Sequence, residues 1–272
     1  MATKKKTWKK VVFYVSDLCI ELTRRCNMAC AHCLRGEQQN LDISFKVINQ
    51  IANHVKCNTV VFTGGEPSLN IKGIDYYFKR AEAIGNIPDG FYVVTNGVDS
   101  KRMSNLALSL LNAYGLICRY NGEPDEYCCG VAVSQDRFHE VFRSPSSMHD
   151  WDVLKGLAFY WHGDKSHSID GNDDWLISSG RAESNGIGNY PKKGNEELDY
   201  WIDDMEIREG ILEIYLNDIL YVSSNGLITS NCDMSYDDID KSNFGNLDEF
   251  IKKCEDYYFN GFGAKIFGGN HE

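Results

Sequence analysis

Three cysteines near the N-terminus, Cys26, Cys30 and Cys33, have a spacing that suits a metal centre. Because the three cysteines lie within eight residues, a short loop can bring their thiolates to one point. A structural zinc site takes four ligands, usually as two separated Cys-x2-Cys pairs. A cubane iron–sulfur cluster normally takes four thiolates, so three would leave one iron open to a ligand that is not protein. The spacing therefore favours a reactive cluster; the alternative is zinc, with Cys57 or a distant cysteine as fourth ligand.

Further along the chain, apolar runs end in residues that could contact a ligand. Each run has the length and β-branched or aromatic content of a buried strand. The runs cover residues 59–63, 91–95, 129–134 and 175–180, and the residues at or just after their ends are Gly64, Gly65, Glu66, Pro67, Thr95, Asn96, Ser134, Asp136 and Arg181. Glycines after a strand allow unusual backbone angles and a close approach to a ligand.

The cysteine motif, with the aromatic His32 before its last cysteine, resembles the cluster signature of the radical S-adenosylmethionine (SAM) superfamily. The segment 64–67 resembles the GGEP element of that family. It lies about thirty residues beyond the cysteines, which is the distance to the next strand in a β–α–β unit. The resemblance implies that a [4Fe-4S] cluster is held by Cys26, Cys30 and Cys33. It also implies a set of SAM-binding residues: His32, Gly64, Gly65, Glu66, Pro67, Thr95, Asn96, Ser134, Asp136 and Arg181.

The chemistry implied by the resemblance is reductive cleavage of SAM. In the family, SAM chelates the open iron, and an electron from the cluster cleaves it into methionine and a 5′-deoxyadenosyl radical that abstracts a substrate hydrogen. A flavodoxin- or ferredoxin-like protein would supply the electron. Other readings remain open for single residues. Ser134 and Asp136 equally suit a helix cap, and Arg181 could form a surface salt bridge instead of binding a carboxylate of SAM or substrate.

The elements that must position these residues alternate between strands and helices. We expect a first strand over residues 13–22, a helix from Ser44 to Val55, and further helices over residues 74–84, 101–114 and 146–161. Strand–helix repetition predicts an α/β fold with a parallel sheet. It resembles the family's partial (β/α)6 TIM-like barrel, in which the loops at the carboxyl ends of the strands converge.

After residue 205 the pattern changes to hairpins, with turns expected at Asn217-Asp218 and Asn225-Gly226, followed by Cys232 and a helix over residues 248–258. This order resembles the SPASM/twitch extension of radical SAM enzymes. We therefore divide the chain into a basic flexible tail (residues 1–10), a partial barrel (11–205) and a twitch-like C-terminal extension (206–272).

The extension has too few cysteines for the family's auxiliary clusters, because it holds only Cys232 and Cys254. We therefore do not expect an auxiliary iron–sulfur cluster. The alternative is one assembled from Cys232 with three scattered cysteines, Cys118, Cys128 and Cys129. Buried free thiols are the commoner fate of such residues.

The amino-acid composition limits the classes of partner that the protein could bind. The formal net charge is −11 although five lysines lie in the first ten residues, and such an acidic body argues against nucleic acid or an anionic membrane as a partner. No signal peptide and no long apolar span is evident, so we expect no membrane association and a cytoplasmic protein. Ten cysteines in this chain indicate a reducing compartment and metal chemistry.

The substrate is left open. The twitch-like tail and the Gly180-Arg181-Ala182 element favour a peptide, and the alternatives are a small metabolite or nucleotide. Cys118, Cys129 or His139 could relay a hydrogen atom to a product radical. A hypothesis of a different class is a non-catalytic zinc- or iron–sulfur-binding module.

Overall fold

The computed structural model describes residues 6–125, 128–161 and 176–262. Its centre is a single mixed sheet with the strand order β4-β3-β2-β1-β6-β5, in which β7 also pairs with β1 and β8 pairs with β7. The strands are β1 (Lys10–Thr23), β2 (Val55–Gly64), β3 (Gly90–Thr95), β4 (Cys129–Val133), β5 (Ile202–Arg208), β6 (Ile211–Leu216), β7 (Ile219–Val222) and β8 (Ile228–Thr229).

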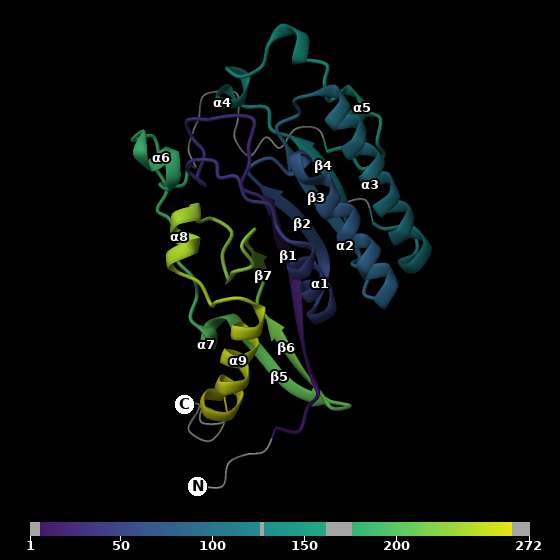
Figure 1. Ribbon diagram of the computed structural model, residues 1–272, viewed down its shortest axis with the longest axis vertical. Coiled ribbons are helices and arrows are strands. Elements are labelled where there is room, and N and C mark those ends of the chain that lie inside the picture. The colour runs from purple at the N-terminus through teal and green to yellow at the C-terminus, as the bar shows by residue number, and fades with distance from the viewer. Residues whose placement is uncertain (1–5, 126–127, 162–175, 263–272) are drawn as a thin grey trace.

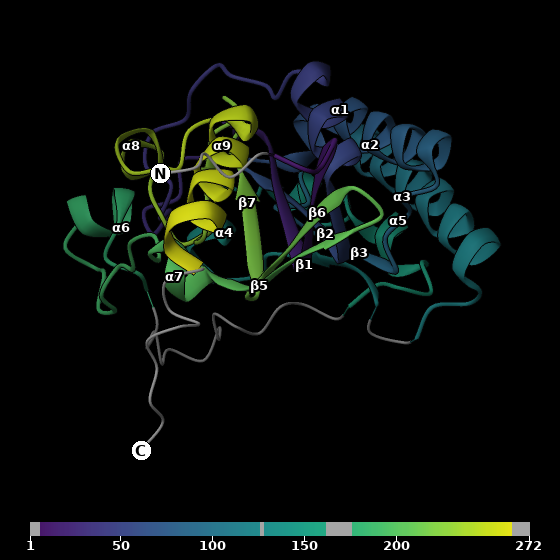
Figure 2. The same ribbon diagram turned by 90° about the horizontal axis from the view of Figure 1, so that it is seen from below.

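The strands β1 to β4 are parallel, as expected, and are linked by helices along one side of the sheet (Figures 1 and 2). These helices are α1 (Phe45–His54), α2 (Ile71–Ile84) and α3 (Ser100–Asn121). Successive side chains along a strand point to opposite faces of the sheet. In β2, Val60 and Phe62 are fully buried in the main core, whereas Val61 and Thr63 line a cavity on the other face.

Local signals set the helix ends. The Ser44 hydroxyl accepts a hydrogen bond from the Val47 amide at 3.3 Å, which confirms Ser44 as the N-cap of α1. The helix ends at His54, one residue earlier than expected, because Val55 begins β2. Gly85, with φ 68°, ends α2 in the left-handed conformation typical of a helix C-terminus.

Two expected elements do not form. Residues 146–161 hold only short turns, η2 (Pro145–Ser147) and α5 (Asp152–Lys155), in place of a helix. Met148 would share a helix face with Trp151 and Leu154, but it is exposed whereas they are buried, so the apolar residues of this segment do not form one buried stripe.

The expected strand at residues 175–180 is reduced to an isolated bridge between Ile177 and Tyr190, followed by helix α6 (Gly180–Ser184); Trp175 lies outside the described residues. Gly180 takes a φ of 56°, a left-handed conformation that ends the extended backbone before α6. In the described residues, the expected helix after β4 and the expected fifth strand are therefore missing.

The C-terminal strands join the central sheet. Both β6 and β7 run parallel to β1, with Tyr14 opposite Tyr215 and Asp17 opposite Ile219. The expected hairpin turn at Asn217-Asp218 is thus wrong: these residues form a bulge between two strands that run in the same direction. Asp218 has a φ of 64°, and its carbonyl oxygen accepts from the Asp17 amide at 3.1 Å.

The second expected turn is confirmed. Strands β7 and β8 are antiparallel, and Asn225-Gly226 lies between them, with Gly226 at φ 83°. Strands β5 and β6 form another antiparallel pair.

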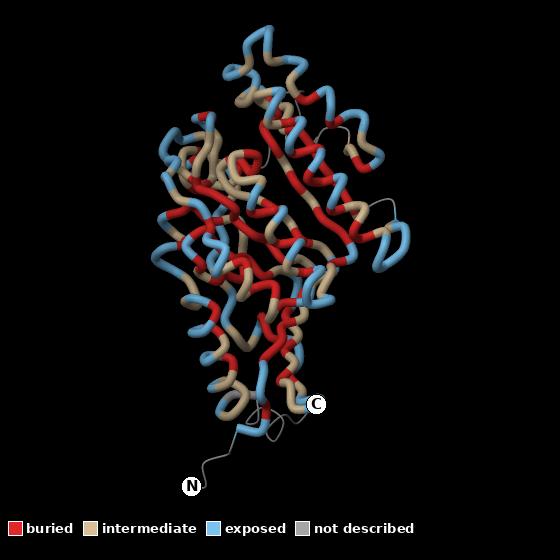
Figure 3. The backbone as a smooth tube through the Cα atoms, turned by 45° about the vertical axis from the view of Figure 1, so that its right-hand side comes forward, coloured by how far each residue is buried: buried red, intermediate tan, exposed pale blue. Residues whose placement is uncertain are grey.

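The remaining helices cover the face of the sheet opposite α1 to α3 and its ends (Figure 2). They are η1 (Pro67–Asn70), α4 (Arg137–Glu140), α7 (Leu198–Trp201), α8 (Tyr236–Lys241), α9 (Leu247–Tyr257) and η4 (Tyr258–Phe262). In α9, Phe250 stacks on Phe13 of β1 with ring centroids 5.0 Å apart, and Cys254 is fully buried. Buried residues follow the strands through the middle of the molecule (Figure 3).

Among the described residues, the longest and most apolar helices still fall short of what crossing a bilayer requires.

A buried charged pair joins β1 to the C-terminal segment. Glu21 and Arg24 are both fully buried, with Arg24 Nε 2.9 Å from Glu21 Oε1. The other nitrogens of Arg24 donate to Asp240 Oδ1 and Oδ2, at 2.8 and 2.9 Å, and to Gln39. Glu21 also accepts from the Tyr221 hydroxyl and the Ser224 amide. Every charged atom of the pair therefore has a partner.

Replacing Arg24 with alanine would leave the Glu21 carboxylate buried without its cation. We expect Arg24→Ala to lower the free energy of unfolding by about 3–5 kcal/mol, measured by urea denaturation. The control is Arg119→Ala, because Arg119 pairs with Glu82 at 3.5 Å on the exposed surface. That variant should change stability by less than about 1 kcal/mol. Equal effects of the two substitutions would contradict the role of the buried network.

Candidate functional site

A cavity of about 600 Å³ opens where the carboxyl ends of β1, β2 and β3 meet. Its inner wall is formed by the strand residues that point away from α1 to α3, including Cys19, Val61 and Tyr92. Its rim is formed by the loops that follow the strands, together with α6 and the segment before α8. The loops that the sequence predicts to converge therefore do so.

The three motif cysteines all line this cavity, in the loop that follows β1. The loop is tightly turned: the Cys33 amide donates to the Cys30 carbonyl at 3.2 Å, and the Met28 amide donates to Cys26 Sγ at 3.4 Å. Burial, reinforced by Cys26 and Cys33, raises the pKa of Cys30 to about 12. The three thiols line one cavity, and Cys26 and Cys33 act electrostatically on Cys30. Three cysteine ligands, with one iron left open, are a donor set that fits an iron–sulfur cluster.

The other cysteines are divided between the cavity wall and the rest of the fold. Cys57 is in β2, 3.8 Å from the Tyr77 hydroxyl of α2, and is not part of the cavity wall, so it does not complete a site with the motif. Cys118 and Cys128 lie near Cys129, at the start of β4. Cys232 instead lines the cavity, beside Cys19. The quartet considered for an auxiliary cluster is therefore not brought together.

The glycines after β2 are required by backbone packing. Gly64 has a φ of 145°, and an added Cβ would lie 2.3 Å from the Thr23 carbonyl oxygen. At Gly65 an added Cβ would lie 2.3 Å from the Arg25 carbonyl oxygen. The amides of Gly65 and Glu66 donate to those two carbonyls at 2.8 and 2.9 Å. The sequence predicts a close approach to a ligand, and the structure shows a close approach to the cysteine loop.

Glu66 connects the loops after β2 and β3. Its side chain is 1% exposed, and its carboxylate accepts hydrogen bonds from the Ser68 amide, the Thr95 hydroxyl at 2.6 Å and the Asn96 amide at 2.8 Å. The Asn96 side chain then donates to Asn27 Oδ1 at 2.7 Å, within the cysteine motif. Glu66, Thr95 and Asn96, which the sequence predicts as site residues, all line the cavity, and so does Pro67.

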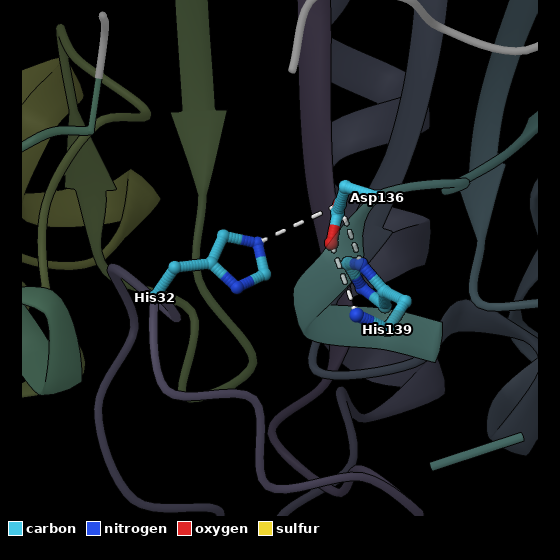
Figure 4. A group of neighbouring side chains, drawn as sticks. All are labelled: His32, Asp136 and His139. Carbon is cyan, nitrogen blue, oxygen red and sulfur yellow. Dashed lines mark hydrogen bonds and ion pairs between the residues drawn. The ribbon is translucent and has the colours of Figure 1, made fainter. Parts of the chain in front are cut away.

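The residues after β4 form a group around His32 (Figure 4). Asp136 caps α4 by accepting from the amides of Phe138 and His139, and its Oδ2 lies 2.6 Å from His139 Nδ1 and 3.9 Å from His32 Nε2. The helix-cap reading of Asp136 is thus confirmed. Burial acts to raise the pKa of Asp136, but the hydrogen bond and charge of His139, with that of His32, outweigh it and lower the pKa to about 2.

His32 itself stacks on Phe138, with ring centroids 4.4 Å apart and an interplanar angle of 21°. His32, His139 and Ser134 line the cavity, whereas Asp136 is not part of the cavity wall. Of the three residues considered for hydrogen relay, His139 alone is part of the cavity wall; Cys118 and Cys129 are not.

Helix α6 packs against the cysteine loop. The Arg181 amide donates to the Cys33 carbonyl at 2.9 Å, and Asn185 Nδ2 donates to the Ala31 carbonyl at 2.9 Å. The Arg181 guanidinium lines the cavity and binds Glu37 through Nε and Nη2, at 2.7 and 2.8 Å. Glu37 is largely exposed, so the surface salt bridge that the sequence left open is present.

Residues 20–151 match the family model described as "Radical SAM superfamily". These residues form a radical SAM domain. The resemblance drawn from the cysteine motif is therefore confirmed. The strands β2 to β4 lie within the matched residues, together with the carboxyl end of β1 and the loops that follow these four strands.

Individual relatives of the radical SAM domain are distant. An uncharacterized protein of Methanocaldococcus jannaschii is 36% identical over 65 residues, which cover 22% of this chain and 23% of the relative. Two solved structures are similar over most of the chain. One is anSMEcpe with bound AdoMet and a peptide, with 12% identity, a TM-score of 0.38, and 91% of this chain and 82% of that chain covered.

The other is Streptococcus suis SuiB bound to the precursor peptide SuiA, with 13% identity, a TM-score of 0.40, and 95% of this chain and 68% of that chain covered. Both TM-scores lie below 0.5, so neither likeness bears on the substrate of this chain.

The packing of Gly65 on the cysteine loop can be tested by adding one methyl group. We expect Gly65→Ala to displace the loop after β2, because its Cβ would overlap the Arg25 carbonyl. Stability should fall by at least about 1 kcal/mol in urea denaturation. Gly194→Ala is the matched control, since an added Cβ there meets no atom within 4 Å. If both variants were as stable as the wild type, the close backbone contact would be refuted.

Proposed function

We propose that this protein is a radical SAM enzyme in which Cys26, Cys30 and Cys33 hold a [4Fe-4S] cluster for the reductive cleavage of SAM. The single observation that carries the proposal is the convergence of the three thiols and the loops after β2 and β3 on one cavity of about 600 Å³. When bound, the cluster and SAM would supply a 5′-deoxyadenosyl radical that abstracts a hydrogen atom from the substrate.

The chain's own residues would bind and orient the cofactor. The SAM-binding residues we propose are His32, Gly64, Gly65, Glu66, Pro67, Thr95, Asn96, Ser134, Asp136 and Arg181. Among them, Glu66 and Asp136 would act by fixing neighbouring loops, because their carboxylate oxygens already accept hydrogen bonds from the chain. His32, stacked on Phe138, would offer an aromatic wall.

Apolar residues would protect the radical. Met28, Val61, Val94, Leu176 and Ile177 line the cavity between the polar groups. Such a lining keeps water out of a closed site and limits side reactions of a reactive intermediate.

The first candidate substrate is a peptide. It is supported by the order of the C-terminal segment, in which the β7–β8 hairpin is followed by Cys232, Gly245-Asn246 and α9, as in a twitch-like extension. Residues 206–272 would then help to close the substrate side of the site. A small metabolite or nucleotide is the second candidate. A non-catalytic metal-binding module is the candidate of a different class.

The proposed enzyme needs a one-electron reductant, for which a flavodoxin- or ferredoxin-like protein is the natural class. We further propose a cytoplasmic location. All ten cysteines lie in the described residues, and none of them forms a disulfide. Free thiols are typical of the reducing cytoplasm.

The assignment is tested by anaerobic reconstitution with iron and sulfide. We expect about four irons per chain, and 5′-deoxyadenosine formed from SAM only when dithionite is present. Cys30→Ala should lose both the iron and the product. Cys57→Ala, which removes a thiol outside the cavity, should keep both. Zinc in place of iron, or a cluster without SAM cleavage, would favour the metal-binding module instead.

The C-terminal extension can be tested for an auxiliary cluster by the same reconstitution. Because Cys118, Cys128 and Cys129 lie near one another but apart from Cys232, we expect Cys232→Ala to leave the iron content unchanged. Iron and sulfide analysis of the reconstituted variant is the measurement. A wild type with about eight irons per chain that falls to about four in Cys232→Ala would mean that Cys232 ligates a second cluster.

A further inference from the structure

Most charged side chains on the cavity wall are already paired within the chain. Arg24 binds Glu21 and Asp240, and Arg181 binds Glu37. The Glu66 carboxylate is satisfied by Ser68, Thr95 and Asn96. Arg24 and Glu66 hold the loops together and have little capacity left for a ligand, and the charge of Arg181 is already offset by Glu37.

Arg35 differs from the other cavity arginines. Its guanidinium lines the cavity and is largely buried, yet no carboxylate of the described residues lies within ion-pair distance of it. Its Nη1 donates to the Met234 carbonyl at 2.8 Å, and its Cζ lies 5.0 Å from the centroid of the Tyr221 ring. The group is therefore held in a fixed position, with donors to spare, because a guanidinium has five N–H groups.

Tyr236 lies beside Arg35 and has an unused hydroxyl. Its amide donates to the Arg35 carbonyl at 3.1 Å, which ties the two residues together. Its side chain lines the cavity and is 2% exposed, and its hydroxyl has no hydrogen-bond partner among the described residues. Leaving such a group buried and unsatisfied costs free energy that a bound ligand would recover.

The nearest acid does not fill this role. Burial acts to lower the pKa of Arg35, but the nearby Tyr221 and then Glu21, with smaller contributions from other groups, outweigh burial and raise the pKa. The oxygens of the Glu21 carboxylate are taken up by Arg24, Tyr221 and the Ser224 amide. Glu21 thus offsets the charge of Arg35 without occupying its donors.

We propose that Arg35 and Tyr236 bind a carboxylate group of the substrate. The inference rests on the proposed function, in which this cavity also holds SAM. A guanidinium offers a carboxylate two parallel N–H donors, and a phenol adds a third donor. Asp233 lines the same part of the cavity and has no cation partner among the described salt bridges. Its negative charge opposes any anion in the cavity, but it opposes a phosphate dianion more strongly than a singly charged carboxylate.

The substrate class that follows is an acid: a peptide presenting its C-terminus or an acidic side chain, or a carboxylic acid metabolite. A neutral substrate would leave the cation and the hydroxyl unpaired in a buried site, at a cost to binding.

The test uses trifluoroacetate as the probe and needs no knowledge of the substrate. Its ¹⁹F resonance is recorded with the reconstituted, SAM-loaded protein, and the dissociation constant is taken from the line width. We expect binding that weakens at least ~10-fold in Arg35→Met and ~3-fold in Tyr236→Phe. Tyr236→Phe removes only a hydroxyl without a partner, so it should fold normally even if Arg35→Met does not. Arg208→Met, on the exposed side of β5, should bind like the wild type.

Three results would overturn the proposal. One is equal binding by the wild type and Tyr236→Phe. Another is tighter binding of fluorophosphate than of trifluoroacetate, which would indicate a phosphate site. The third is binding to the cluster-loaded protein that disappears when SAM is added, which would assign the site to the carboxylate of SAM. Formation of 5′-deoxyadenosine by Tyr236→Phe, assayed separately, keeps a failure of this inference distinct from a failure of the enzyme assignment.

Discussion

The site depends on the contact between the backbones of two loops. The loop after β2 lies so close to the loop after β1 that Gly64 and Gly65 have no room for a side chain, and two amides donate directly to the carbonyls of Thr23 and Arg25. This contact places Glu66 where it can reach the end of β3, and Asn96 where it can reach Asn27 of the cysteine motif. The position of the three thiols is therefore set by hydrogen bonds that run from strand end to strand end.

Buried charges are handled in two ways in this structure. Glu21 with Arg24, and Glu66 alone, are enclosed and fully hydrogen-bonded, which is the condition under which burial of a charge is tolerated. Arg35 and Tyr236 are also buried, but their polar groups are not all used within the chain. Satisfied groups stabilise the scaffold, whereas unsatisfied groups on a cavity wall indicate where a ligand binds.

Sequence reasoning succeeded where the determinants are local. The cysteine spacing, the apolar runs of β2, β3 and β4, and the Ser44 cap each depend on a few neighbouring residues. It failed where a distant partner decides. Asn217-Asp218 has the composition of a hairpin turn, but pairing with β1 makes it a bulge. Arg35 and Tyr236 carry no motif, and only the folded chain brings them together.

The pairing of β6 and β7 with β1 has a consequence for the order of assembly. β1 lies in the middle of the sheet, and one of its neighbours comes from a segment about two hundred residues later: Tyr221, for example, bonds Glu21 across 200 positions. Until that segment arrives, one edge of β1 and the buried carboxylate of Glu21 stay open to solvent. Contacts of such long range slow folding, because the chain between them must be closed first. The cysteine loop extends directly from this strand, so the three thiols reach their final surroundings only after the last quarter of the chain has joined the sheet.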